Sequence, residues 1–163
     1  MRLRRVVWRL PDGSISLSCP ANDAPLPGKT VQECLDRIAA RALIADPSLA
    51  GAVRIDTGET MLSDLPSRRF RHCWRHDGVV VINMPLAREQ RMGEVRKERD
   101  ALLKESDHDK HRLDDIGTLQ QKTALGVYRQ ALRDLPALAE VAMAVIADPA
   151  QLAAYNPQWP VKP

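Results

Sequence analysis

ALGVYRQALRDLP, residues 124–136, is the stretch that decides the fold of the C-terminal half of this chain. Its apolar side chains recur at i, i+3, i+4, i+7, i+8 and i+11. They are Ala124, Val127, Tyr128, Ala131, Leu132 and Leu135. This spacing predicts an amphipathic helix over about 118–135. Pro136 is expected to end that helix, because proline lacks the backbone N–H and clashes with the preceding turn.

A second helix is predicted before this stretch, over residues 85–107, where Pro85 is favourable at the first helical position. The segment is dense in Arg, Glu, Lys and Asp, and its apolar stripe is thin. The stripe consists of Met92, Val95, Leu102 and Leu103, interrupted by Arg99 and Ser106. A helix this polar needs a partner. We therefore expect the two helices to form an antiparallel hairpin joined near residues 108–117.

The C-terminal end is expected to contain less regular structure. Residues 137–147 are rich in Ala, Val and Leu and are typical of a shorter helix, and Asp148-Pro149 is expected to cap another turn. The tail 155–163 contains three prolines and is predicted to be extended. Such a segment is suited to lie in the groove of a partner.

The first 83 residues are interpreted as a small α+β module. Pro11-Asp12-Gly13 predicts a turn between strands at 3–10 and 14–19, whereas the proline-rich residues 20–29 indicate a loop. Thr30-Val31-Gln32-Glu33 is a capping box that predicts a helix ending near Asp46-Pro47.

The rest of this module contains weaker signals. A short strand is predicted over 53–56, followed by a turn at Thr57-Gly58. A short helix is expected to carry Phe70 and Trp74, which we interpret as core anchors. Asp77-Gly78 then leads into an apolar run over 79–82, which predicts a buried strand. The fold class is therefore α+β, with a head module at 1–83 and a helical docking arm at 84–163.

Composition excludes few functions. The net charge is +3 and hydrophobic residues make up 44% of the chain, so a core is feasible but a nucleic-acid partner is not indicated. Cys19, Cys34 and Cys73 form no CxxC pair and are interpreted as reduced thiols. No run approaches 18 apolar residues, and the basic start lacks the apolar length of a signal peptide, so no membrane partner is expected.

Three clusters carry reactive side chains, and each has a plainer interpretation. His108, His111 and Asp115 share a helix face and are metal-ligand types, but basic residues interleave with them. A Cys/His nucleophile drawn from His72, Cys73 and His76 lacks an orienting carboxylate. A third cluster could contact phosphates, as a nucleic-acid-binding regulator would require. It comprises Arg68, Arg69, Arg71 and Arg75. With no phosphate loop, GxSxG or HExxH motif, we predict no catalytic residue, metal or cofactor.

Several short motifs resemble a known family. They are FRHCWR at 70–75, NMPLARE at 83–89, RKERDALL at 96–103, YRQALRD at 128–134 and WPVKP at 159–163. Together they resemble bacteriophage tail-region proteins, in particular tail assembly chaperone and tail fibre assembly proteins. His108 departs from the family pattern, which has Trp after the Asp.

The resemblance implies no catalysis, no cofactor, and a partner among phage tail or tail-fibre proteins, with a homo-oligomer also possible. The expected function is a virion-associated adaptor, and the alternative is a transient assembly chaperone. Its location would be the host cytoplasm during assembly, or the virion tail if it is structural. The residues expected to bind the partner are Met92, Val95, Leu102, Tyr128, Leu132, Leu135, Trp159 and Pro160.

Overall fold

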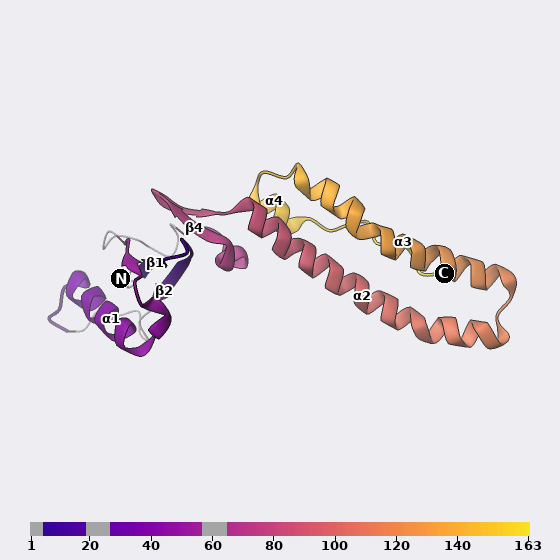
Figure 1. Ribbon diagram of the computed structural model, residues 1–163, viewed down its shortest axis with the longest axis horizontal. Coiled ribbons are helices and arrows are strands. Elements are labelled where there is room, and N and C mark those ends of the chain that lie inside the picture. The colour runs from indigo at the N-terminus through magenta and orange to yellow at the C-terminus, as the bar shows by residue number, and fades with distance from the viewer. Residues whose placement is uncertain (1–4, 19–26, 57–64) are drawn as a thin grey trace. The chain divides into compact units, whose positions relative to one another are not determined.

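The structure is a computed structural model that describes residues 5–18, 27–56 and 65–163. The chain divides into two compact units, 1–83 and 84–163. The first contains small sheets and a helix, and the second is helical (Figure 1). The predicted α+β class is confirmed.

A three-stranded antiparallel sheet forms the first part of unit 1–83. Its strands are β1 (Val6–Arg9), β2 (Ile15–Ser18) and β3 (Val53–Arg54), in the order β2-β1-β3. Gly13, with φ of +79°, provides the left-handed conformation in the turn between β1 and β2. The predicted hairpin is confirmed, whereas the predicted turn at Thr57-Gly58 lies outside the described residues.

Helix α1 (Val31–Ala45) packs on this sheet. The capping box is present as predicted: the Thr30 hydroxyl accepts from the Glu33 N–H, and the Glu33 carboxylate accepts from the Thr30 N–H. The helix ends at Asp46, and η1 (Pro47–Leu49) follows. The core between sheet and helix consists of Val6, Trp8, Leu35, Ala39 and Leu49.

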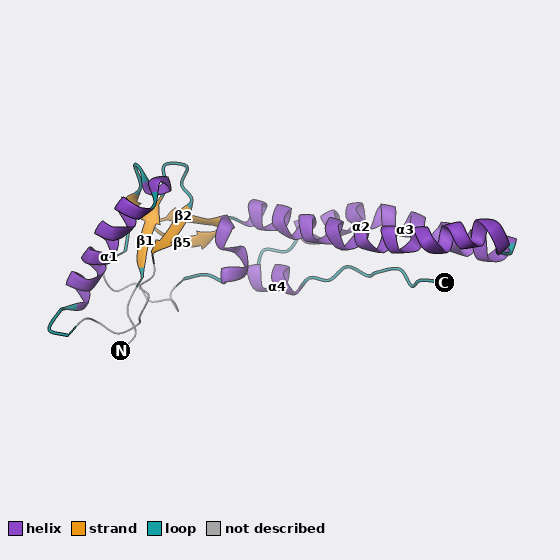
Figure 2. Ribbon diagram, turned by 90° about the horizontal axis from the view of Figure 1, so that it is seen from below, coloured by secondary structure: helices purple, strands orange, loops and turns teal. Residues whose placement is uncertain are grey.

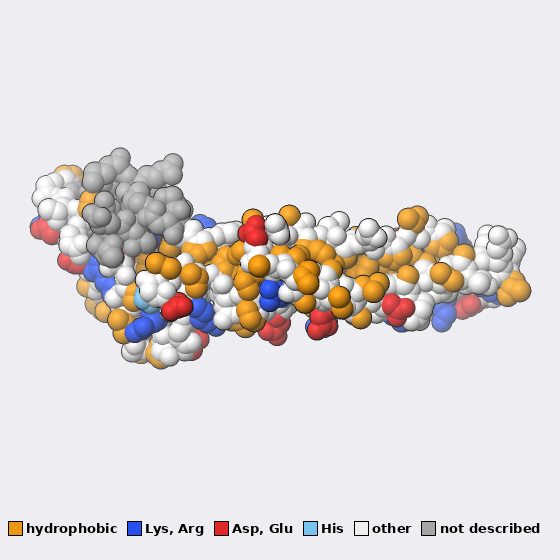
Figure 3. Space-filling view, turned by 90° about the horizontal axis from the view of Figure 1, so that it is seen from above, with side chains coloured by type: hydrophobic (Ala, Val, Ile, Leu, Met, Phe, Trp, Pro, Cys, Tyr) orange, Lys and Arg blue, Asp and Glu red, His pale blue; other side chains and the backbone are white. Residues whose placement is uncertain are grey.

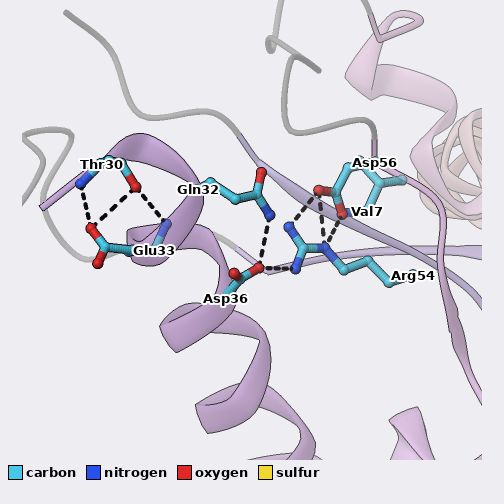
Figure 4. Close-up of polar contacts among 7 residues, drawn as sticks. All are labelled: Val7, Thr30, Gln32, Glu33, Asp36, Arg54 and Asp56. Carbon is cyan, nitrogen blue, oxygen red and sulfur yellow. Dashed lines mark hydrogen bonds and ion pairs between the residues drawn. The ribbon is translucent and has the colours of Figure 1, made fainter.

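The guanidinium of Arg54 links β3 to α1 (Figure 4). It donates to Asp56 at 2.9 Å and to Asp36 at 2.6 Å. Asp56 also accepts from the backbone N–H of Val7 at 3.1 Å. The hydrogen bonds from Arg54 and Gln32 hold the pKa of Asp36 below its ordinary value.

The remaining part of unit 1–83 contains η3 (Arg68–Cys73) and a two-stranded hairpin of β4 (Trp74–Asp77) and β5 (Val79–Ile82). Phe70 is 0% exposed and Trp74 is 1% exposed, as expected of core anchors, although Trp74 begins β4 and is not helical. The prediction that β5 is a buried strand is wrong. Val79 is 65% exposed, because β5 pairs with β4 alone in this sheet and has one face open.

Unit 84–163 is built from α2 (Met84–Ile116), α3 (Leu119–Ala144) and α4 (Pro149–Ala154), followed by an extended tail. Figure 1 shows α2 and α3 side by side in opposite directions, which confirms the predicted hairpin. The predicted boundaries of α2 were too short. The helix continues through 108–116, where neither Gly nor Pro interrupts it, so the connection consists of Gly117 and Thr118 alone.

Helix α3 also continues past the residue expected to end it. Pro136 lies inside the helix, at a cost of about 3 kcal/mol relative to alanine in a helix interior. The buried face of the helix continues beyond Pro136, where Ala139 is 1% exposed and Met143 is 2% exposed. Full burial of a side chain such as Met143 contributes about 1.5–3 kcal/mol, which offsets much of the cost.

The short turn of the hairpin generates a first prediction. A Cβ at Gly117 would lie 2.6 Å from the Leu113 carbonyl oxygen, whereas a Cβ at Gly93, inside α2, would meet nothing within 4 Å. Gly117→Ala should therefore destabilise the hairpin by about 1–3 kcal/mol, as overpacking does. Gly93→Ala should stabilise it, because alanine is the better helix former. Urea unfolding monitored by circular dichroism checks both signs, and equal effects would contradict the steric argument.

Candidate functional site

The residues expected to bind a partner lie mostly in the seam between α2 and α3. Those buried there are Met92, Val95, Tyr128, Leu132 and Leu135, each at most 6% exposed. Leu102 and Trp159 are partly buried and pack against a cluster of Leu125, Tyr128 and Leu132. Pro160 is also partly buried. These side chains therefore hold the unit together, and their binding to a partner stays a prediction.

Helix α3 carries two apolar stripes, and the residues predicted from the sequence to face α2 come from both of them. The buried stripe follows a 3-4 spacing that brings one face of α3 onto α2. It consists of Leu125, Tyr128, Leu132, Leu135 and Ala139. Val127 was expected in this seam but is 66% exposed, whereas Leu125 was missed and is 4% exposed. The signal that identifies Leu125 is its position three residues before Tyr128.

The second stripe of α3 faces outward. Its large apolar members are Val127, Leu138, Val141 and Val145, which are between 66% and 83% exposed. They fall at i, i+11, i+14 and i+18, and therefore on one side of the helix. Figure 3 shows hydrophobic side chains gathered along unit 84–163 in a space-filling view. We call Val127, Leu138, Val141 and Val145 the outer stripe. No residue that the structure describes covers it.

The tail 155–163 lies along the hairpin in an extended conformation, as predicted (Figure 2). At its start, the buried guanidinium of Arg91 donates to the Tyr155 carbonyl oxygen at 2.8 and 3.2 Å. In its middle, Trp159 packs on the seam. At its end, the Lys162 ammonium lies 2.9 Å from Glu105 and 2.8 Å from Asp109.

These contacts agree with the dimensions of the two elements. Seven extended residues from Tyr155 to Lys162 span about 22 Å at 3.1 Å per residue. The 14 helical residues from Arg91 to Glu105 span about 21 Å at 1.5 Å per residue. The tail thus matches the helix in length, and Trp159 closes the seam where the stripe of α2 is thin. The tail was expected to lie against a partner, but in the structure it contacts α2 of its own chain at Arg91, Glu105 and Asp109.

The contacts at the cationic end of the tail shift the pKa values of the groups that form them. The hydrogen bond from Lys162 lowers the pKa of Asp109 from its ordinary value of 3.8, and the nearby charges of Lys162, Arg112 and His108 act in the same direction. The same contacts with Asp109 and Glu105 raise the pKa of Lys162 above its ordinary 10.5. Both groups are therefore charged at neutral pH.

A cleft of about 250 Å³ lies near the closed end of the hairpin. Leu113 and Leu125 contribute its apolar part. Its charged residues are Lys110, Lys122, Arg129, Arg133 and Asp114, and Gly126 completes the lining. Arg129 bridges the two helices, because its guanidinium lies 2.8 Å from Asp107 and donates to the Ser106 hydroxyl and the Leu103 carbonyl oxygen. A glycine inside a helix costs roughly 0.8–1.0 kcal/mol relative to alanine, so Gly126 is locally unfavourable.

The clusters considered for other chemistry are placed as follows. Arg68, Arg71, His72 and Arg75 line a cavity of about 440 Å³ in unit 1–83, together with Trp74. Cys34 and Cys73 are buried thiols, and Cys19 lies outside the described residues. Within residues 5–18, 27–56 and 65–163, no three His, Cys, Asp or Glu side chains are grouped to hold a metal. No helix in these ranges has an apolar stretch long enough to cross a membrane.

The two stripes of α3 generate a second prediction. Leu132 is 0% exposed and Leu138 is 71% exposed, on the same helix. Leu132→Ala should destabilise the hairpin by about 2–5 kcal/mol through the cavity it leaves. Leu138→Ala should change stability by no more than about 0.5 kcal/mol. Urea unfolding of the two variants measures the difference. Similar losses from both would mean that the outer stripe is also part of the core.

The tail contacts generate a third prediction, which concerns pH. A carboxyl group with a lowered pKa stabilises the folded state above its ordinary pKa, and this contribution is lost as pH falls through the lowered value. The contact between Asp109 and Lys162 should therefore be complete at pH 7 and weaken below about pH 3.8. The NMR signal of the Trp159 indole N–H should move toward its unfolded position on acidification.

Lys162→Met should shift the same signal at pH 7. Lys104→Met, which removes an exposed lysine of α2 itself, next to Glu105, should leave the signal in place. An indole signal that is unchanged in Lys162→Met would show that the ion pairs do not hold the tail.

Comparison with known proteins adds to this geometry. A family model described as phage tail assembly chaperone protein matches residues 92–163. The match begins inside α2 and includes α3, α4 and the tail, which are the elements that form the hairpin and the extended segment along it. No curated protein and no solved structure matches the chain at a significant level. The resemblance indicated by the sequence motifs is thus confirmed for residues 92–163, which are similar to phage tail assembly chaperone proteins.

Proposed function

We propose that this protein is a non-enzymatic chaperone of phage tail assembly that binds a tail or tail-fibre protein through unit 84–163. The observation that carries the proposal is the family match over residues 92–163, which includes most of α2, all of α3 and α4, and the tail, and leaves out residues 1–91. The protein acts in the host cytoplasm and leaves before the particle is complete. The match favours this alternative over the virion-associated adaptor that was first expected.

The outer stripe of α3 is the surface that suits such a role. The buried stripe of α3 already packs against α2, so a partner has to bind another face of the helix. Exposed apolar side chains in a row along a helix typically mark a protein interaction site. A second helix can pack on such a row at i, i+3, i+4 and i+7 spacing. The outer stripe would thereby cover an apolar face of a tail subunit until that subunit meets its neighbours in the tail.

A fourth prediction tests this surface. The double variant Leu138→Gln, Val141→Gln removes two apolar side chains that are 71% and 73% exposed, without changing charge or helix propensity greatly. Burial of each at an interface contributes about 1.5–3 kcal/mol, and 1.4 kcal/mol corresponds to a tenfold change in affinity. Binding to the tail partner should therefore weaken at least tenfold, while the helical content stays unchanged.

The measurement is co-purification after co-expression with phage tail and tail-fibre proteins, followed by titration of the partner that co-elutes. Leu119→Gln is the matched control, because Leu119 is an apolar residue of α3 that is 82% exposed and lies off the outer stripe. Equal binding by the double variant and the control would exclude the outer stripe as the docking surface.

Mass spectrometry of purified phage particles separates the chaperone from the adaptor. Absence of the chain from particles that require it for assembly is expected of a chaperone. Its presence in a fixed ratio to a tail protein would contradict this proposal and establish the virion-associated adaptor. Failure of every tail protein to co-elute would contradict both.

A further inference from the structure

Residue 126 lies in the interior of α3, and nothing in the described part of the chain requires it to be glycine. Its φ is not in the left-handed region, and a Cβ at this position would meet no heavy atom within 4 Å. Gly117 differs in this respect, because its Cβ would collide with Leu113. Alanine would therefore fit at Gly126 and favour the helix. A glycine in such a place allows an external group to approach the backbone closely. Gly93 is equally open, and Gly126 differs from it because it lines the cleft between α2 and α3.

The surroundings of Gly126 indicate what that group is. Lys122, Gly126, Arg129 and Arg133 lie at i, i+4, i+7 and i+11, so they form one row on the surface of α3. Gly126 is the gap in a row of three cations. Lys110 of α2 borders the same cleft. The missing side chain keeps the cleft open between Lys122 and Arg129 and leaves the apolar part of the cleft accessible beside them.

The charges of the cleft are only partly neutralised. Arg129 lies 2.8 Å from Asp107, and Lys122 donates to the Asp114 carbonyl oxygen at 3.2 Å. The exposed side chains of Lys110 and Arg133 have no hydrogen-bond or ion-pair partner among the residues that the structure describes. With four cations and the single carboxylate of Asp114, the lining has an excess of positive charge.

This excess is local. Between residues 84 and 163 there are twelve Lys or Arg and twelve Asp or Glu, so the unit as a whole is formally neutral. A nucleic-acid site relies on a broad basic footprint that neutralises many phosphates. Here a small cationic cleft surrounds Leu113 and Leu125 instead. That combination complements a protein segment in which carboxylates flank a small or apolar side chain.

We infer that the cleft around Gly126 is a binding site for an acidic, leucine- or alanine-containing segment of a partner protein, whose backbone passes over Gly126. The identification of that partner as a tail protein rests on the proposed function, whereas the chemistry of the cleft does not. The acidic residues of the segment pair with Lys110 and Arg133, and its apolar side chain contacts Leu113 and Leu125. The cleft and the outer stripe share no residue, so the two surfaces give a partner separate contacts.

The test uses the full-length protein and a synthetic peptide rich in glutamate with interspersed leucine and alanine. NMR titration should shift the amide signal of Gly126 and the methyl signals of Leu113 and Leu125, and added salt should weaken binding because screening reduces exposed charge pairs. Gly126→Ala should raise Tm by roughly 3–8 °C through its helix propensity and yet weaken peptide binding at least tenfold. A variant that is more stable but binds less cannot be explained by a structural role of Gly126.

Gly93→Ala is the matched control, because Gly93 also lies in a helix interior with no atom within 4 Å of a Cβ. It should raise Tm and leave peptide binding unchanged. Wild-type affinity in Gly126→Ala, peptide-induced shifts confined to other residues, or equal binding of a peptide with lysine in place of glutamate would overturn the inference. Duplex DNA that shifts the same signals more strongly would overturn it in favour of a nucleic-acid site.

The outcome is independent of the tail partner. Peptide binding without co-purification of any tail protein would contradict the proposed function alone. Co-purification with normal affinity in Gly126→Ala, together with no peptide binding, would contradict the cleft alone.

Discussion

The packing of the buried stripe of α3 against α2 is the interaction on which unit 84–163 depends. Helix α2 has 33 residues, yet its buried apolar side chains are only Ala87, Met92 and Val95. A helix so polar gains little from its own sequence and is stable through its partner. Leu132 and its neighbours provide that partner, and Trp159 of the tail covers the part of the seam where α2 offers only partly buried leucines.

Because the buried stripe of α3 packs against α2, the proposed function assigns partner binding to the outer stripe of the same helix. The two sides of α3 differ in exposure: Leu132 is fully buried, whereas Val141 is 73% exposed. Under the proposed function, stability and binding therefore depend on different residues of one helix. We expect substitutions in the outer stripe to leave the hairpin folded, and substitutions in the seam to disturb the helix that positions the outer stripe.

The sequence was sufficient for features with local causes. The capping box at Thr30, the turn at Gly13 and the hairpin of two long helices all follow from neighbouring residues. It was insufficient where the cause lies far along the chain. Helix α3 has two stripes of similar apolarity, so the spacing of apolar residues alone does not predict which stripe is buried. The continuation of α3 through Pro136 depends on a surface that α2 supplies. The contact of Lys162 with Glu105 joins residues 57 positions apart, which no local pattern reveals.

The electrostatics of unit 84–163 show why composition also misses the cleft. The formal charge of these residues is zero, but charge is sorted by contact. Asp109 and Glu105 are paired with Lys162 on one side of α2. The cations at Lys110 and Arg133 therefore face solvent without those carboxylates. At physiological salt, exposed charges interact over about 8 Å, so the nearest neighbours decide the local field and the net charge does not. A neutral hairpin can in this way present a cationic surface to one partner segment and an apolar surface to another.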